Sequence, residues 1–329
     1  MALLLSEHDV ARCLDMASLI PLMRDTLRRF SRRETVQPVR QSLRIRPAEG
    51  FYGVMPAHVP GENGDPGAFG LKSVSFFPGN DALGLPTHLA TILLLDPRTG
   101  ALVALLDGRL ITETRTAAVS AVSADLLGKQ GPVTLAILGS GVQAKSHLEA
   151  MKVIRPLKHV RVWSRRPERA LSFVRATHQA VSCPVSAVPS VLDAMHGADI
   201  VVTATSAVDP IVPARALESG MHLCVVGSSS PRMRELDSQA VKRCRVWVDS
   251  REATQIEAGD ILIPMREGTI DETHIIGELG DVIDGRSGRL SPDEITMFKS
   301  LGMAVEDVAT ASLVVSRARA KNIGKEITI

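Results

Sequence analysis

Aromatic side chains are scarce in this sequence, in which Phe, Tyr and Trp together make up 3% of 329 residues. The core must therefore be built from Ala, Val, Leu and Ile, as buried parallel sheets and their covering helices usually are. This composition favours an α/β fold. At the usual domain size of about 100–200 residues, the length predicts two domains.

Runs of like charge and long apolar runs are also missing. The charged fraction is 22% and the net charge is +2, with Lys and Arg scattered along the chain. Because a nucleic-acid-binding surface needs clustered basic residues, we expect a small-molecule partner and no nucleic acid. No apolar stretch reaches the ~18 residues of a membrane span, and the N-terminus "MALLLSEHDV" lacks the basic region and cleavage site of a signal peptide. We therefore expect a cytoplasmic protein that does not bind a membrane.

Cysteine pairs at metal-binding spacing are absent too. The cysteines lie far apart and form no C-x-x-C pair: Cys13, Cys183, Cys224 and Cys244. This spacing argues against a zinc site or a disulfide framework and fits a reducing compartment. We expect no metal.

In the first third of the chain, the pattern of apolar and polar residues changes at residue 37. Ser6 followed by Asp9 is a helix-start signal, and "ASLIPLMRDTLRRFSR" has apolar residues at helical spacing, so we expect the chain to open with helices. Residues 37–107 consist of short apolar or alternating runs separated by Pro, Gly and Asn, with "DPRTG" as a hairpin turn. They predict a mostly antiparallel sheet. The Ala-rich stretch "ITETRTAAVSAVSADLLG" predicts a helix that begins with Thr and ends on Gly128.

After "KQGP", strand and helix patterns alternate. The expected strands are "VTLAIL", "HVRVW", "PVSAV", "DIVVTAT", "HLCVVG" and "CRVWVD", and the expected helices include "QAKSHLEAMKVI", "PERALSFVRATHQ" and "SVLDAMHG". Such alternation indicates a parallel, doubly wound sheet with right-handed crossovers over roughly residues 116–300. The last segment, "GMAVEDVATASLVVSRARAKNIG", predicts a long amphipathic helix that packs back onto the first domain.

A glycine turn joins the first strand of this sheet to its helix. In "AILGSGVQA", Gly139, Gly141 and Ala144 form G-x-G-x-x-A. The first glycine permits the tight turn, the second lets the backbone approach a pyrophosphate, and the alanine allows close helix–strand packing. Alone, such a motif is often only a turn, but its place between a strand and a helix predicts dinucleotide binding. Thr203 and Thr205, at the end of another parallel strand, fall at the sheet edge where ligands bind.

The residues that follow the second strand indicate which nucleotide is bound. An acidic side chain there would bind the ribose 2′-hydroxyl of NAD, but "VRVWSRRPERA" offers Ser164, Arg165 and Arg166. A hydroxyl and guanidinium groups can bind a 2′-phosphate that a carboxylate would repel. We predict NADPH over NADH, although these arginines could also be ordinary solvated loop residues.

Two basic side chains stand out as anion ligands. Arg115 is expected in the first turn of its helix, where a cation is unfavourable for the helix dipole unless an anion binds nearby. Lys72, read on a strand, shares a face with Val74 and Phe76, so its burial would be costly unless it were paired or had a lowered pKa. It is the best candidate for a proton donor, with an ordinary edge lysine as the alternative.

Two further candidates are weaker on the residues alone. Arg40 has the same strand parity as Arg44 and Arg46, which by itself suggests a solvated basic face. His88 could serve as a general acid, but a lone histidine in an apolar strand is more often a satisfied structural group. We therefore regard His88 as a cofactor contact first.

Several stretches together resemble the ornithine cyclodeaminase/mu-crystallin family over essentially the whole chain. They are "QPVR", "GVMPAH", "LKSVSFF", "PTHLATILLLDPRTGALVALLDG", "TETRTAAVSAVS", "ILGSGVQA", "VVGSSSPRMRELD", "VWVDSREA" and "FKSLGMAVEDV". The resemblance implies an α+β substrate-binding and dimerisation domain, residues 1–115 plus 302–329. A Rossmann domain, residues 116–301, is inserted into it. It also implies a homodimer.

The resemblance implies specific site residues. Arg40, Lys72 and Arg115 would hold a substrate carboxylate. The residues expected to contact the cofactor are Thr87, His88, Arg115, Thr116, Gly139, Ser140, Gly141, Val142, Gln143, Ser164, Arg165, Arg166, Thr203, Thr205, Val226, Lys299 and Ser300. Glu257 and Asp260 of "EAGDI", like Lys299 and Ser300, would close over the cofactor or the sheet edge, or be ordinary loop polar groups.

One loop departs from the cyclodeaminase pattern. In ornithine cyclodeaminases the corresponding V-G-G-D-x-P loop carries an aspartate that assists cyclisation and ammonia loss. Aligned on Gly227 and Pro231, that position is Ser229, which would lie in the substrate site. A serine hydroxyl cannot act as a general base at neutral pH without a partner, so the loop favours reduction.

The first hypothesis is an NADPH-dependent reductase of cyclic ketimines such as Δ1-piperideine-2-carboxylate or Δ1-pyrroline-2-carboxylate, with NADH possible but less preferred. Lys72 and Arg115 would be its catalytic residues. The second hypothesis is an alanine or N-alkyl amino-acid dehydrogenase that uses a 2-oxo acid and an amine. An ornithine cyclodeaminase-type lyase is the third. The fourth, from a different class, is a crystallin-like protein that binds NADPH and hormone-like ligands without catalysis.

Overall fold

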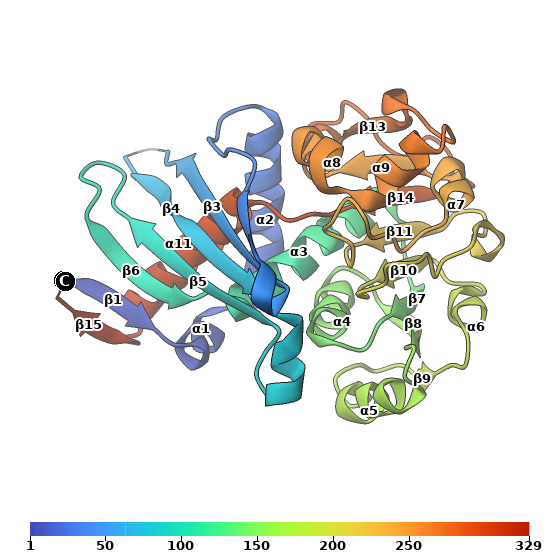
Figure 1. Cartoon of the computed structure of the whole chain (residues 1–329), viewed down its shortest axis with the longest axis horizontal. Helices are drawn as coiled ribbons and strands as arrows, with labels where there is room; N and C mark the ends of the chain where they lie inside the picture. The colour runs from blue at the N-terminus through green and yellow to red at the C-terminus, as the bar shows by residue number, and fades with distance from the viewer. Residues whose placement is uncertain (63, 329) are drawn as a thin grey trace. The chain divides into compact units, whose positions relative to one another are not determined.

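The computed structural model describes residues 1–62 and 64–328. These residues fall into two compact units (Figure 1). Unit 1 comprises Met1–Arg115 and Met303–Ile329, and unit 2 comprises Thr116–Gly302. The predicted α/β class is confirmed, because each unit combines a sheet with packed helices.

The described part of unit 1 contains a seven-stranded sheet in the order β15-β1-β6-β5-β4-β3-β2. Its strands are β1 (Ala2–Leu5), β2 (Gln41–Ile45), β3 (Gly50–Pro60), β4 (Gly67–Phe76), β5 (His88–Leu95), β6 (Leu102–Asp107) and β15 (Lys325–Ile327). Strands β2 to β6 pair antiparallel, as predicted for residues 37–107. Two short 3-10 helices, η1 (Arg46–Ala48) and η2 (Pro78–Leu83), lie in its connections.

The expectation that the chain opens with helices is wrong. Strand β1 comes first and pairs with β6 in parallel and with β15 antiparallel. The apolar run at the N-terminus is too short to show a period, and its partner strand lies at the other end of the chain. The hairpin turn is confirmed: the Asp96 side chain accepts hydrogen bonds from the backbone N–H groups of Arg98 and Thr99 between β5 and β6.

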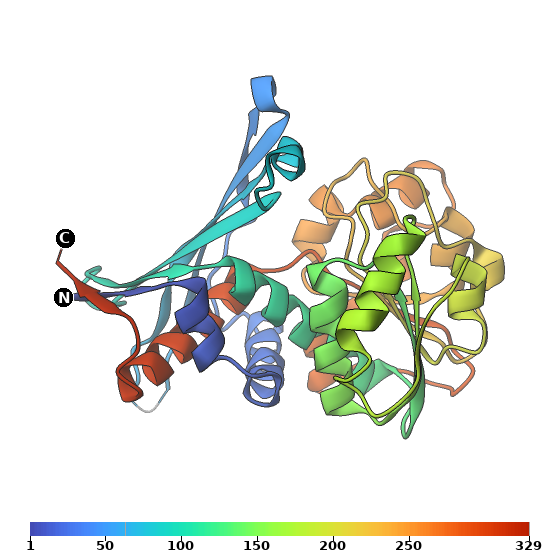
Figure 2. The ribbon, with the colours of Figure 1, turned by 90° about the horizontal axis from the view of Figure 1, so that it is seen from below.

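Three helices of unit 1 pack together on the sheet. Helix α1 (Glu7–Cys13) begins with a capping box between Ser6 and Asp9, and α2 (Met16–Ser31) is capped by Asp15. Helix α11 (Ala304–Ala320) contacts α1, α2 and strands β3, β4 and β5. In Figure 2, α11 (red) and the two N-terminal helices (blue) lie on the same side of this sheet.

Helix α11 packs onto the first domain as predicted, but it is not amphipathic throughout. Residues 304–311 are all buried, including Glu306 and Asp307. The face of the sheet that α11 covers includes the row Met55, Lys72 and Ile92, which are paired across β3, β4 and β5 and buried. Charged side chains are therefore brought together in the interior of unit 1.

The described part of unit 2 contains an eight-stranded sheet in the order β13-β12-β14-β11-β10-β7-β8-β9. The strands are β7 (Val133–Leu138), β8 (Leu157–Trp163), β9 (Val185–Ala187), β10 (Ile200–Thr203), β11 (His222–Val225), β12 (Arg245–Val248), β13 (Ile275–Glu278) and β14 (Thr296–Lys299). Their pairings are parallel. The chain runs outward from β7 through β8 and β9, then returns to the other side of β7 at β10. The predicted doubly wound sheet is confirmed, and its switch point lies between β7 and β10.

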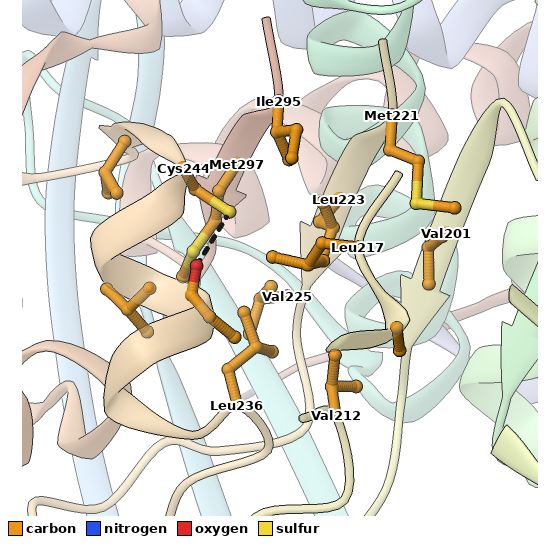
Figure 3. Packing of buried hydrophobic residues seen from close by; sticks show 14 of the residues in the cluster. Val201, Val212, Leu217, Met221, Leu223, Val225, Leu236, Cys244, Ile295 and Met297 are labelled. Carbon is orange, nitrogen blue, oxygen red and sulfur yellow. Dashed lines mark hydrogen bonds between the residues drawn. The ribbon is translucent and has the colours of Figure 1, made fainter. Parts of the chain in front are cut away.

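The helices of unit 2 connect these strands. They are α4 (Val142–Ile154), α5 (Pro167–Thr177), α6 (Val191–Met195), η3 (Ala214–Ala216), α7 (Ser238–Arg243), α8 (Arg251–Glu257), α9 (Gly259–Arg266), η4 (Glu272–His274) and α10 (Leu279–Ile283). One apolar core of the unit, drawn in Figure 3, packs strand residues such as Val201, Leu223 and Val225 against Val212 and Leu236. Among the described residues, no helix is long and apolar enough to cross a membrane.

Helix α3 (Arg109–Leu127) continues from the last residues of unit 1 into unit 2. It ends before Gly128 as predicted, but it begins at Arg109, earlier than the sequence pattern suggests. Arg115 therefore lies in the second turn of the helix. Arg115 is therefore not in the first turn, and the prediction that its charge opposes the helix dipole there is wrong.

Candidate functional site

Four charged side chains form a buried cluster in unit 1, named here the charged cluster: Lys72, Arg115, Glu306 and Asp307. The Nζ of Lys72 lies 2.6 Å from Oδ2 of Asp307. Arg115 donates from Nε to Oδ1 of Asp307 at 2.9 Å and from Nη1 to Oε2 of Glu306 at 2.7 Å. Lys72 and Arg115 are 2% and 3% exposed and both acids 0%, so none of these charges is screened by bulk water.

The start of α11 explains why two acids can be buried here. Glu306 and Asp307 lie in the first turn of the helix, where the helix dipole favours negative charge. The carboxylate of Glu306 also accepts a hydrogen bond from the backbone N–H of Met303, and the side-chain oxygen of Gln37 accepts one from Val305 N–H. Buried charges are tolerated when they are paired and hydrogen-bonded in this way.

Lys72 has an unusual protonation equilibrium. Burial lowers the pKa of Lys72 to about 8, and the positive charges of Arg115 and Arg40 also lower it, while Asp307 opposes the shift. The sequence predicted that a buried Lys72 would be paired with an anion or have a lowered pKa, and both are observed. The structure brings Lys72 and Arg115 together on Asp307, while the Arg40 charge also acts on Lys72, and the role of all three as carboxylate ligands stays a prediction.

His88 and Thr87 lie at the start of β5. His88 is an exposed residue whose ring packs against Phe76 with ring centroids 4.6 Å apart and has Nδ1 3.2 Å from Oγ1 of Thr87. Partial burial of the ring lowers the pKa of His88. Its assignment as a cofactor contact remains a prediction.

The glycine turn of unit 2 has the geometry that a pyrophosphate requires. Gly139 has φ +127°, and a Cβ there would lie 2.4 Å from the carbonyl oxygen of Ala204, so only glycine fits. A Cβ on Gly141 would meet nothing within 4 Å, which leaves space beside the turn. Ala144 is fully buried against the sheet.

The start of α4 offers unoccupied donors at this turn. Gly141 is the N-cap residue, and no side chain caps the helix. Val142 is 56% exposed, and the side-chain oxygen of Gln143 is buried without a hydrogen-bond partner. Uncapped N–H groups at a helix N-terminus favour a phosphate. These features fit a dinucleotide.

The end of β8 carries no carboxylate. The Ser164 hydroxyl accepts hydrogen bonds from the Ser140 hydroxyl at 3.1 Å and from Arg166 N–H at 3.4 Å, which ties this strand end to the glycine turn. Arg165 and Arg166 are exposed, and neither guanidinium forms an ion pair with a described residue. Their contact with a 2′-phosphate stays a prediction.

Three predicted cofactor contacts point inward instead. Thr203 and Lys299 are 0% exposed and Ser300 is 2% exposed, and their contact with a cofactor stays a prediction. Their side chains bind carboxylates inside unit 2: Thr203 donates to Glu235, Lys299 pairs with Asp260, and Ser300 lies 3.4 Å from Asp249. At these three positions the backbone N–H and C=O groups could contact a cofactor.

The other residues expected to contact the cofactor or substrate stay predictions. Thr116 is 6% exposed in α3, and Thr205 and Val226 are half-buried at the ends of β10 and β11. Ser229 is exposed in the loop after β11, while its neighbour Ser228 donates its hydroxyl to the carbonyl of Met233.

Sequence reasoning missed the acids that hold these groups. Glu306, Asp307 and Glu235 were not singled out, and Asp260 was expected to close over the cofactor or the sheet edge. Asp260 is instead fully buried and accepts hydrogen bonds from the backbone N–H of Glu235 at 2.7 Å. A buried acid is recognisable only once its partner is known, because acidic residues in loops and first turns are common in solvated positions.

The fold and these residues define a two-unit α/β protein with a nucleotide-binding type of parallel sheet. The chain belongs to the ornithine cyclodeaminase/mu-crystallin family, whose family model matches residues 1–322.

Individual relatives cover nearly the whole chain. A ketimine reductase mu-crystallin from Mus musculus is 40% identical over 314 residues, 94% of this chain and 95% of the relative. The structure of Δ1-pyrroline-2-carboxylate reductase from Thermococcus litoralis, in complex with NADH and L-proline, has a TM-score of 0.95 and 35% identity, covering 99% of this chain and 100% of that one. An archaeal alanine dehydrogenase dimer with bound NAD has a TM-score of 0.92 and 29% identity, covering 100% of this chain and 99% of that one.

Proposed function

We propose that this chain is an oxidoreductase that reduces cyclic ketimines carrying a 2-carboxylate, such as Δ1-pyrroline-2-carboxylate or Δ1-piperideine-2-carboxylate. The observation that carries the proposal is the buried carboxylate of Asp307, which pairs with both Arg115 and Lys72, whose pKa is about 8. A lysine with a pKa near neutrality beside fixed arginines suits a substrate that has a carboxylate and a basic nitrogen. The names of the relatives support the same reaction.

Unit 1 would bind and protonate the substrate. The guanidinium of Arg115 is held in one orientation by Glu306 and Asp307, so it can present a fixed edge to a carboxylate. Arg40 adds positive charge in the same region. Protonated Lys72 would give its proton to the imine nitrogen. A carboxylate clamp of this kind orients the C=N bond and lowers the entropic part of the barrier.

Unit 2 would hold the nicotinamide dinucleotide through the glycine turn, the N-terminus of α4 and the end of β8. When bound, that cofactor supplies the hydride for the imine carbon. We include in this proposal that Lys72 and Arg115 are catalytic and that the other predicted residues contact the cofactor. We also propose that residues 1–115 and 302–329 bind the substrate and form the dimer interface, and that residues 116–301 bind the cofactor.

We also propose that NADPH is preferred. The support is the row Ser164, Arg165 and Arg166, which offers a hydroxyl and exposed guanidinium groups without a competing carboxylate. NADH is the less preferred alternative, and the relative from Thermococcus litoralis was solved with NADH.

A homodimer is supported by one face of the unit 1 sheet. Leu43, Tyr52, Ser75 and Leu89 pair in one row across β2 to β5, on the face opposite to Lys72. Leu43 and Leu89 are 63% and 45% exposed, and exposed apolar residues grouped on one face favour association. Light scattering of the wild type and of Leu89→Asp tests this, because a charge on the face should give a monomer.

Compartment is a further part of the proposal. Cys13, Cys183, Cys224 and Cys244 are all free thiols. Burial raises the pKa of Cys224 and Cys244 to about 12, so both stay protonated. Four free thiols, two of them held protonated, suit a reducing compartment, and we propose the cytoplasm.

The decisive experiment measures NADPH and NADH oxidation against a panel of five- and six-membered cyclic imines with a 2-carboxylate. The proposal predicts oxidation with a preformed imine and no added amine. Activity only with a 2-oxo acid plus an amine would replace it with an amino-acid dehydrogenase, which the similarity to alanine dehydrogenase keeps as the second candidate. Oxidation with neither set of substrates would overturn both.

A further inference from the structure

A buried carboxylate links the ends of two strands in unit 2. Glu235 is 0% exposed, and each of its oxygens accepts hydrogen bonds from two donors. Oε1 accepts from the backbone N–H of Thr205 at 2.8 Å and from its hydroxyl at 2.7 Å. Oε2 accepts from the backbone N–H of Gly227 at 2.7 Å and from the hydroxyl of Thr203 at 2.6 Å.

These donors lie at the carboxyl ends of β10 and β11, which are neighbours in the sheet. The two strand ends pack so closely that no side chain fits at Gly227. A Cβ on Gly227 would lie 2.1 Å from the carbonyl oxygen of Thr205 and 2.5 Å from Oε1 of Glu235. The residue before Thr205 is Ala204, whose carbonyl oxygen would lie 2.4 Å from a Cβ on Gly139 of the glycine turn.

Lys299 and Asp260 hold the same region from the other side. Lys299, at the end of β14, donates to the carbonyl of Ser228 and lies 3.2 Å from Asp260. Asp260 in turn accepts hydrogen bonds from the backbone N–H groups of Glu235 and Leu236 at 2.7 and 3.1 Å. Burial and the Asp260 charge raise the pKa of Glu235, and the Lys299 charge opposes this shift.

The position of these loops assigns them to one half of a dinucleotide. In open parallel sheets the cofactor lies across the switch point at the carboxyl edge, here between β7 and β10. The glycine turn follows β7 and the Ser164–Arg166 row follows β8, so they serve the pyrophosphate and the adenosine half. The loops after β10 and β11 are left for the nicotinamide riboside half.

We propose that Glu235 is a positioning residue for the nicotinamide half of the cofactor, fixing the backbone of the loops after β10 and β11 without touching the cofactor itself. This inference rests on the proposed function, in that it requires a nicotinamide dinucleotide to bind unit 2. It also explains why the predicted contact Thr203 is fully buried: its hydroxyl serves Glu235.

The substitution Glu235→Gln tests the idea at nearly constant volume. A glutamine replaces one acceptor oxygen by an NH2 donor, and each oxygen of Glu235 faces a backbone N–H, from Thr205 or from Gly227. Hydroxyls can rotate away from a donor, but a backbone N–H cannot. Either orientation of the amide therefore forces one of the two loops to shift.

The readout is binding, measured by calorimetry with NADPH and with 2′,5′-ADP, which contains only the adenosine half. Because the shifted loop must return to its original position before it can hold the nicotinamide half, Glu235→Gln should raise the Kd of NADPH about tenfold. The Kd of 2′,5′-ADP should stay within about twofold, because its contacts lie on the other side of the switch point. An equal loss for both ligands, or no loss for either, would overturn the proposal.

Glu278→Gln is the matched control. Glu278 is another buried carboxyl, 3% exposed, at the end of β13 on the outer edge of the same sheet, where it accepts from Arg251 N–H at 3.1 Å. It should leave both affinities unchanged. If the wild type binds neither NADPH nor NADH, the proposed function fails instead.

Thr203→Val keeps the proposal testable if Glu235→Gln does not fold. Thr203 is fully buried, so its side chain can affect a bound cofactor only through Glu235. The loss of one neutral donor should weaken NADPH by a few-fold and leave 2′,5′-ADP unchanged. An unchanged NADPH affinity in Thr203→Val would contradict the positioning role.

Discussion

The carboxylate of Asp307 lies 2.6 Å from the ammonium of Lys72, and both groups are buried in unit 1. The same carboxylate accepts a hydrogen bond from Nε of Arg115 at 2.9 Å. One acid on α11 thus sets both the charge state of the proposed proton donor and the orientation of the proposed carboxylate ligand.

The first prediction concerns the pH dependence of reduction. The pKa of Lys72 is about 8, so the ammonium is present below that pH and is lost above it. For an imine whose own nitrogen is neutral, kcat/KM should be level below pH 8 and fall about tenfold per pH unit above it. The profile is measured with saturating cofactor from pH 6 to 10. Lys72→Arg should lose this limb because a guanidinium stays protonated; a limb that persists in this variant would exclude Lys72 as the donor.

The second prediction separates the two neighbouring acids of α11. Asp307 raises the pKa of Lys72, so Asp307→Asn should lower that pKa and move the basic limb to lower pH. Glu306 is as deeply buried as Asp307 but pairs with Arg115 and not with Lys72. The basic limb of the pH profile of Glu306→Gln should therefore stay where it is in the wild type. The comparison is one of pH profiles. Equal shifts in both variants would mean that the limb reports a general disturbance of the cluster.

The third prediction tests the carboxylate clamp. Arg115→Ala should lower kcat/KM for the imino acid by about two orders of magnitude or more, because a charge-assisted pair to the substrate is lost. It should also destabilise the protein by roughly 3–5 kcal/mol, because Glu306 and Asp307 lose a buried partner. Steady-state kinetics and urea unfolding measure the two effects separately.

Arg317→Ala is the control for the clamp, since Arg317 pairs with the half-exposed Asp15 at the other end of α11. It should change kcat/KM little. A wild-type value of kcat/KM in Arg115→Ala would remove the clamp from the mechanism.

Local signals made much of the fold predictable. Alternating strand and helix patterns located β7 to β12, and the glycine turn located the start of α4. Strands β13, β14 and β15 were missed, as was β1 at the N-terminus. Strands β10 to β12 are as short as these, but they lie within longer apolar runs such as "DIVVTAT" and "HLCVVG", whereas β13 (IIGE), β14 (TMFK) and β15 (KEI) mix apolar and polar residues.

Within the candidate site, the sequence singled out only residues whose side-chain chemistry is unusual for their position in a strand or helix. Lys72 stood out because a lysine on an apolar strand face is costly. Its partner Asp307 did not, because an acid in the first turn of a helix is common on the surface. Thr203 and Lys299 were assigned by position on the chain, and only their burial shows that their side chains serve carboxylates within unit 2.

The fourth prediction concerns cofactor choice. If Arg165 and Arg166 bind a 2′-phosphate, Arg165→Ala and Arg166→Ala should each lower kcat/KM for NADPH by about tenfold or more and leave NADH unchanged. Arg169→Ala, a change at an exposed arginine on the following helix α5, is the control and should affect neither. A wild-type preference for NADH would contradict the prediction from the outset.

The last prediction concerns acid stability and two buried histidines of unit 2. Nδ1 of His147 donates to the carbonyl of Gln143 at 2.7 Å, and its Nε2 lies 2.9 Å from the Ser120 hydroxyl. The nitrogens of His222 lie 3.1 Å from Ser123 Oγ and 2.9 Å from Thr296 Oγ1. Burial lowers the pKa of His147 to about 4 and that of His222 to about 3. Both rings are therefore neutral in the folded state above these values.

The unfolded chain binds more protons than the folded one between pH 6.5 and these lowered pKa values, so stability should fall as pH falls through that window. At pH 5 each histidine accounts for about 2 kcal/mol of this loss. His147→Gln should remove its share, so the difference in unfolding free energy between pH 7 and pH 5, measured by urea titration, should shrink by that amount. The same pH dependence in His147→Gln as in the wild type would show that the ring has the same pKa in the folded and unfolded states, which would contradict the prediction.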